Sequence, residues 1–172
     1  MAVVRNANQG LHAADLGATL LQLRDPDATV RALERETTRL VVEAQVPVVV
    51  SARVDLALAA GAAGAHLPEA DIAVAAARRL LGDARLVGRS VHSVSAALEA
   101  EAQGADYVVF GPVFGSASHP DRAPAGLESL SQVARAVTIP VLAIGGVDAT
   151  RAAACADAGA AGFAAIGYFG GR

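Results

Sequence analysis

Residues 96–110 read AALEAEAQGADYVVF, and this unit decides the fold. An alanine-rich helical run ends at Gly104, where glycine can adopt the left-handed conformation that closes a helix. An apolar, β-rich run, Tyr107–Phe110, follows within a few residues. The same order of helix, glycine and strand recurs around Gly17, Gly61 and Gly159. Apolar strands that alternate with helices indicate a parallel sheet covered by helices on both faces.

Further helix-to-strand steps lie between these units, with helices predicted over Thr29–Ala44, Asp71–Leu81 and Leu127–Val137. The strands that we expect are Ala2–Val4, Thr19–Leu23, Val46–Val50, Ala65–Leu67, Leu86–Gly88, Tyr107–Phe110, Val141–Ile144 and Phe163–Ile166. Eight such steps favour a TIM (β/α)8 barrel, and residues 1–172 read as a single barrel domain. The barrel is shortened at both ends and lacks a final helix. We therefore expect a second subunit to cover the last strand, in a homo-oligomer, or imperfect closure there.

Composition excludes several classes of protein. Of the 172 residues, 53% are hydrophobic and 18% charged, the net charge is −3, and all 14 basic residues are arginines. Lysine-dependent chemistry is therefore excluded, and one cysteine excludes an intrachain disulfide framework. Clustered cations and aromatic residues are too few for a nucleic-acid partner. The apolar stretches are too short for a membrane span and no secretion signal is present, so we predict a cytoplasmic protein.

Polar residues follow the predicted strands, at the end of a barrel where active sites form. Gly145 and Gly146 follow the seventh strand, and Gly167 follows the eighth. Two glycine-marked loops at this position favour a phosphate site, because backbone N–H groups can approach an anion there. The alternative is that these are ordinary turn glycines.

His92 precedes a predicted helix, and its imidazole can take and return a proton near neutral pH. It is either catalytic or merely the residue before an N-cap at Ser93. His66 lies inside a strand and reads as a packed core histidine. His119 lies in a polar loop that resembles a lid, where it either contacts substrate or is solvated. His12 is expected on the surface.

Two arginines and two acidic residues are further candidates for ligand binding. Arg24 and Arg53 follow strands and suit a carboxylate or a phosphate, although Arg53 could instead pair with Asp55 or Asp71. The histidines and carboxylates show none of the usual metal-binding spacings. Asp71 and Glu69 could hold Mg²⁺ with help from substrate phosphates, or Asp71 caps the helix that follows it.

Several runs together resemble the thiamine phosphate synthase/TenI superfamily. They are GRSVHS at 88–93, ADYVVFGPVF at 105–114, GLE at 126–128 and IPVLAIGG at 139–146. The similarity is collinear and covers about Leu16 to Ile166. The resemblance implies a TIM barrel that binds a phosphate-bearing ligand of the thiamine pathway.

Departures from the pattern point to one branch of the superfamily. The synthases of this superfamily join a pyrimidine pyrophosphate to a thiazole phosphate with Mg²⁺. The resemblance implies that they carry lysines at the positions that are Pro26 and His119 in this chain, and an aspartate at the position that is Ala52. This chain keeps only Asp71 of the metal positions. The TenI-like tautomerases also lack the aspartate at Ala52 and carry the GRSVHS signature, with a functional histidine that matches His92.

We therefore predict a thiazole phosphate tautomerase, an isomerase without a cofactor that converts a carboxylated dihydrothiazole phosphate into the aromatic thiazole phosphate, with His92 moving the proton. The alternatives are a Mg²⁺-dependent thiamine phosphate synthase with Asp71 as metal ligand and a silent precursor-binding barrel. The predicted substrate contacts are Gln22, Arg24, Arg53, Ser90, Ser116, Ser118 and His119. The predicted phosphate contacts are Gly126, Gly145, Gly146, Ile166 and Gly167.

Overall fold

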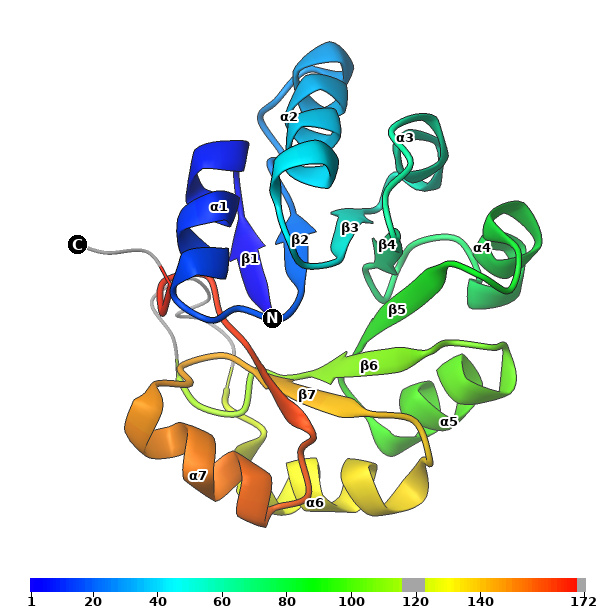
Figure 1. Cartoon of the computed structure of the whole chain (residues 1–172). Helices are drawn as coiled ribbons and strands as arrows, with labels where there is room; N and C mark the ends of the chain where they lie inside the picture. Colours follow the sequence, from blue (N-terminus) through cyan, green and yellow to red (C-terminus); the bar gives the residue numbers. More distant parts are fainter. Residues whose placement is uncertain (116–122, 170–172) are drawn as a thin grey trace.

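The computed structural model describes residues 1–115 and 123–169. Eight parallel strands form one sheet in sequence order, and seven helices surround it (Figure 1). The strands are β1 (Ala2–Val4), β2 (Leu21–Leu23), β3 (Val48–Ser51), β4 (Gly64–Leu67), β5 (Leu86–Val91), β6 (Tyr107–Phe110), β7 (Val141–Ile144) and β8 (Gly162–Ala164). The helices are α1 (Ala7–Asp15), α2 (Val30–Glu43), α3 (Val54–Ala59), α4 (Val74–Leu81), α5 (Val94–Ala102), α6 (Gly126–Ala136) and α7 (Ala149–Asp157). The predicted TIM barrel is confirmed.

The sheet closes on itself through a short seam between β8 and β1. Ala2 and Ala165 form an isolated parallel bridge. The Val3 N–H donates to the Ala165 carbonyl at 2.9 Å, and the Ala165 N–H donates to the Met1 carbonyl at 3.1 Å. The seam is narrow, but it leaves no open gap between the first and last strands.

No helix follows β8 within the described residues, and an aromatic side chain occupies that side of the barrel. Phe169 stacks on Phe163 of β8, with ring centroids 6.2 Å apart. It is buried in the apolar cluster that also holds Ala7 and Ala13 of α1. The chain thus covers part of its own last strand, and the expected second subunit stays a prediction.

Local sequence explains where the helices begin. Asn6, Thr29, Ser93 and Asp148 are N-caps whose side chains accept the N–H of the residue three positions on, as short polar side chains do at helix starts. Helix α4 differs from its prediction, since it begins at Val74 rather than at Asp71 and has no side-chain cap.

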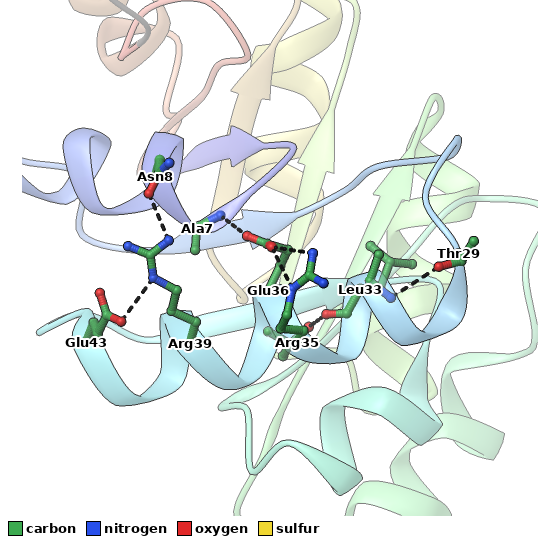
Figure 2. A network of polar contacts seen from close by, with 10 residues as sticks. Ala7, Asn8, Thr29, Leu33, Arg35, Glu36, Arg39 and Glu43 are labelled. Atoms are coloured by element: carbon green, nitrogen blue, oxygen red, sulfur yellow. Dashed lines mark hydrogen bonds and ion pairs between the residues drawn. The ribbon is translucent and has the colours of Figure 1, made fainter.

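Side chains also join neighbouring helices on the outside. Figure 2 shows α1 beside α2, where the Glu36 carboxylate accepts the Ala7 N–H at 2.9 Å. Arg39 donates to Asn8 of α1 at 2.8 Å and to Glu43 of its own helix at 3.0 Å (Figure 2). These contacts hold the first two helices together beside β1 and β2.

Most of the core lies between the sheet and the helices, and a smaller cluster fills the barrel interior. The interior cluster contains Met1, Val3, Tyr107, Val109 and Ala164. Inward-facing residues nearer the carboxyl ends of the strands are polar, among them Gln22, His66 and Ser90. The barrel is therefore apolar at one end and open and polar at the other.

Candidate active site

A hollow of about 840 Å³ opens at the carboxyl ends of the strands. Every strand, or the loop that follows it, contributes to its wall. The lining residues are Val3, Gln22, Arg24, Ser51, His66, Pro68, Glu69, Ala70, Ser90, His92, Val109, Gly111, Pro112, Ile144, Gly145, Gly146, Val147, Asp148, Ala164, Ala165, Ile166, Gly167 and Tyr168. This is the position at which barrels of this architecture place their active sites.

Many of the predicted site residues meet at this hollow. Those among its lining are Gln22, Arg24, Ser90, His92, Gly145, Gly146, Ile166 and Gly167. They come from four separate parts of the chain, so only the closed barrel brings them together. Their proposed contacts with substrate stay predictions.

Other predicted residues do not line the hollow. Arg53 donates two hydrogen bonds to Asp55, at 2.9 and 2.6 Å, which is one of the alternatives that the sequence left open. Gly126 lies at the first turn of α6, where its N–H donates to the Val113 carbonyl at 3.0 Å. Three further predicted contacts, Ser116, Ser118 and His119, lie outside the described residues.

The wall formed by the β7 loop is made of backbone. Gly145 and Gly146 have φ values of +94° and +61°, which other residues rarely adopt. A Cβ on Gly145 would lie 2.6 Å from Pro112 Cβ, and one on Gly146 would lie 2.5 Å from the Gly115 carbonyl oxygen. Both positions therefore need glycine, and both leave peptide groups exposed to a ligand.

Arg151 of α7 stabilises this loop through its side chain. Its guanidinium donates to the Gly146 carbonyl at 2.8 Å and lies 4.9 Å from the centroid of the Phe114 ring. The Asp148 side chain caps α7 by accepting the backbone N–H of Arg151. Arg151 therefore bonds to both Gly146 and Asp148 of the loop between β7 and α7. A preorganised loop can bind an anion without first being ordered.

His92 and Glu69 lie together at the rim. The Gly111 carbonyl accepts a hydrogen bond from Nδ1 of the His92 imidazole. A carbonyl can only accept, so Nδ1 is the ring nitrogen that carries the hydrogen. Glu69 accepts the His92 backbone N–H at 3.2 Å, and its other carboxylate oxygen lies 3.7 Å from Nε2. The predicted cap at Ser93 is also present, so His92 both precedes an N-cap and lines the hollow.

His66 is the packed core histidine that we expected, but it also reaches the floor of the hollow. It is 2% exposed, and burial, followed by the nearby charge of Arg89, lowers its pKa to about 3. Its Nε2 lies 2.8 Å from Ser90 Oγ and its Nδ1 lies 3.2 Å from the Tyr107 hydroxyl. A neutral imidazole is thus connected to a hydroxyl that lines the hollow.

Asp71 is the candidate metal ligand, and its two carboxylate oxygens differ. Oδ1 accepts the Ile72 N–H at 2.7 Å. Oδ2 is buried and has no hydrogen-bond partner among the described residues. Groups of three or more metal-binding side chains are absent from the described ranges. A lone carboxylate fits Mg²⁺ only where substrate phosphates supply further oxygens, which is the usual way in which proteins bind this ion.

Sequence reasoning missed several lining residues. Ser51 is the last residue of β3, one position past the predicted strand, and that position was a signal that could have identified it. Glu69, which the sequence offered together with Asp71 as a possible Mg²⁺ ligand, also lines the hollow. Tyr168 lies beyond the last predicted strand, where nothing in the local pattern indicated an approach to the hollow. Ser90 lies within β5, which extends to Val91 and not only to the predicted Gly88.

Comparison with known proteins identifies the relatives of this chain. The sequence profile described as thiamine monophosphate synthase matches residues 3–169. The chain belongs to the thiamine monophosphate synthase family. Two relatives named thiamine-phosphate synthase, from Chloroflexus aurantiacus and Roseiflexus castenholzii, are each 45% identical to it. Each match covers 87% of this chain, and 71% and 68% of the respective relative.

A solved structure from the same family supports the fold. Thiamine phosphate pyrophosphorylase from Pyrococcus furiosus superposes with a TM-score of 0.85 at 33% identity. The superposition covers 96% of this chain and 84% of the Pyrococcus chain. The similarity therefore extends over nearly the whole of the barrel whose strand ends form the hollow.

These findings correct the functional prediction. The chain was expected to be a tautomerase, but the relatives that match most of it at 45% identity carry the name of a synthase, which is a transferase. The isomerase prediction is wrong. It gave decisive weight to the missing lysines and the missing aspartate, although a metal ion and backbone donors can also neutralise phosphate charge.

Within residues 1–115 and 123–169, none of the helices is both long enough and apolar enough to cross a bilayer.

Proposed function

We propose that this protein is a thiamine-phosphate synthase, which joins a pyrimidine pyrophosphate to a thiazole phosphate and releases pyrophosphate. In this reaction a ring nitrogen of the thiazole forms a C–N bond, the C–O bond to pyrophosphate breaks, and pyrophosphate keeps the electron pair. The observation that carries the proposal is 45% identity to a named synthase over 87% of this chain.

The two walls of the hollow suit two anionic groups. Gly145, Gly146 and Gly167 present backbone toward the hollow and are proposed to bind the thiazole phosphate. Arg24 lies on the opposite side, at the end of β2, and its guanidinium forms no ion pair with any described carboxylate. We assign the pyrophosphate to Arg24, because a guanidinium binds phosphate oxygens in a bidentate manner.

The absence of lysine makes the proposed reaction depend strongly on a metal ion. Mg²⁺ would neutralise the departing pyrophosphate, and Asp71 is the residue in this chain that would help to hold it, through the carboxylate oxygen that lacks a partner. Asp71 itself is not among the residues that line the hollow, whereas Glu69 and Asp148 line it and add negative charge to it. Arg24 alone therefore leaves a pyrophosphate poorly neutralised.

The direct test supplies both substrates and Mg²⁺ to the purified protein and measures thiamine phosphate by fluorescence after oxidation to thiochrome. We expect thiamine phosphate and pyrophosphate in equal amounts. Chelation of Mg²⁺ with EDTA should abolish the signal and excess Mg²⁺ should restore it. Failure to form thiamine phosphate from protein that binds the thiazole phosphate would refute the proposal.

Asp71→Asn tests the metal assignment with little change in shape. We expect this variant to need more Mg²⁺ for half-maximal activity, because an amide oxygen lacks the charge of a carboxylate. Asp55→Asn is the matched control, since Asp55 pairs with Arg53 outside the hollow. An unchanged Mg²⁺ requirement in Asp71→Asn would remove Asp71 from the site.

A further inference from the structure

Three polar side chains on adjacent strands are joined by hydrogen bonds, from a buried tyrosine to a half-buried serine that lines the hollow. Tyr107 on β6 bonds to His66 on β4, and His66 bonds to Ser90 on β5. Gly88 makes the arrangement sterically feasible, because a Cβ there would lie 2.1 Å from the Tyr107 ring. Of the three, Ser90 and His66 reach the wall of the hollow.

The direction of the first hydrogen bond follows from the chemistry of tyrosine. Tyr107 is 5% exposed, and burial, followed by the charge of Asp106, raises the pKa of its hydroxyl. The hydroxyl therefore keeps its proton, and a buried O–H needs an acceptor. His66 Nδ1, at 3.2 Å, is its partner among the described residues. Nδ1 then accepts the bond and carries no proton.

The direction of the second bond follows from the first. A neutral imidazole carries one proton, so His66 must carry it on Nε2 when Nδ1 is an acceptor. Nε2 then donates to Ser90 Oγ at 2.8 Å. Once Ser90 Oγ accepts this bond, its own hydroxyl proton is available to donate to another group.

We infer that Tyr107 and His66 are positioning residues that fix Ser90 as a hydrogen-bond donor toward an acceptor group of the ligand, of the class of phosphate or pyrophosphate oxygens. If both bonds ran in the opposite direction, Ser90 would donate to His66 and its oxygen would be left to accept a hydrogen bond from the ligand. That arrangement would suit an amino group of the ligand instead. The nature of the ligand rests on the proposed function, whereas the direction of the bonds does not.

The direction can be measured in the protein without any substrate. The ¹⁵N NMR shifts of the His66 side chain, assigned by their loss in His66→Gln, report which ring nitrogen carries the proton. We expect the proton on Nε2. Tyr107→Phe should lose this preference, and Tyr168→Phe, the matched removal of a hydroxyl that is not bonded to His66, should keep it. A proton on Nδ1 in the native protein would overturn the inference.

Binding of inorganic pyrophosphate in the presence of Mg²⁺ tests the consequence for Ser90. We expect Ser90→Ala to weaken binding about fivefold, the effect of one typical hydrogen bond, and Tyr107→Phe to weaken it somewhat less. In the Ser90→Ala background, Tyr107→Phe should have no further effect. Independent effects of the two substitutions would indicate a general structural role for Tyr107 and would refute the positioning role.

The two measurements separate this inference from the proposed function. If the protein forms no thiamine phosphate but His66 carries its proton on Nε2 and the two substitutions are coupled, the synthase proposal fails and the positioning role stands. If thiamine phosphate forms but the coupling is absent, the synthase proposal stands and the positioning role fails.

Discussion

The two walls of the hollow use different parts of the chain to meet a ligand. Along β2 to β5 the wall consists of side chains, including Gln22, Arg24, Ser51 and Ser90, whereas along β7 and β8 much of it is glycine backbone. The side-chain wall carries Arg24, His66, Glu69 and His92, whereas Asp148 and Tyr168 follow the strands of the backbone wall. The backbone wall has a shape that any added atom would change. Substitutions on the two walls should therefore impair ligand binding for different reasons, namely the loss of a functional group on the side-chain wall and the loss of space on the backbone wall.

The largest effect is expected on the backbone wall. Gly145→Ala combines a left-handed conformation, which costs about 1–2 kcal/mol, with overpacking against Pro112, which costs about 1–3 kcal/mol. We expect a loss of about 2–5 kcal/mol in the free energy of unfolding and a loss of thiazole phosphate binding, measured by urea denaturation and calorimetry.

Gly17→Ala is the matched control for this prediction. Gly17 has a φ of +92°, close to the +94° of Gly145, but a Cβ there meets nothing within 4 Å. It should lose only about 1–2 kcal/mol and should keep ligand binding. Equal losses in the two variants would show that close packing at Gly145 contributes nothing.

On the side-chain wall, Arg24→Ala should lower kcat/KM about 10–100-fold, because a hydrogen bond to a charged group contributes about 1.5–3 kcal/mol. Stability should hardly change, since the side chain is exposed. Arg53→Ala is the control, because it breaks only an exposed ion pair with Asp55 and should change kcat/KM less than about fivefold. Similar losses in both variants would contradict the assignment of pyrophosphate to Arg24.

The buried part of the same wall should make stability depend on pH. The pKa of His66 falls from 6.5 to about 3 on folding, so the unfolded chain takes up a proton first as the pH drops. The free energy of unfolding should therefore decrease from about pH 6.5 down to about pH 3, by up to about 1.4 kcal/mol per unit. Between pH 7 and pH 5 the loss should be about 2 kcal/mol, and His66→Gln should remove it. Parallel pH profiles of the two proteins would refute this origin.

The smallest effect is expected at Ala52, which has glycine-like backbone geometry directly after β3. Its φ is +58°, the one positive value outside glycine among the described residues. Ala52→Gly relieves this strain but loosens the unfolded chain, so we expect a net gain of about 0.5 kcal/mol. Thermal unfolding should show a slightly higher Tm. A clear decrease would mean that the Ala52 methyl group makes stabilising contacts.

Much of the fold could be predicted because its signals are local. The run 105–110 was expected to be a buried strand after a glycine-closed helix, and β6 occupies Tyr107–Phe110. Asp71 misled the prediction of α4, because an aspartate before an apolar run resembles an N-cap, yet its side chain accepts the adjacent Ile72 N–H.

The candidate site was predictable in part. Its glycine loops and Arg24 could be found from their position after strands, since all strand ends of a parallel barrel meet at one rim. The partner of Arg53 could not be chosen, because Asp55 and Asp71 were both acceptable until the loops were placed. The bond between His66 and Ser90 joins residues on separate strands, so no local pattern encodes it.

By itself the sequence determined the number and order of the strands, the absence of lysine and the positions of the glycines, because these depend on residue type and short-range periodicity. Only the tertiary structure decided which polar groups share the hollow, that Phe169 packs where an eighth helix would lie, and that Ser90 is bonded to a buried imidazole. Such pairings join residues far apart in the chain, and their geometry exists only once the barrel has closed.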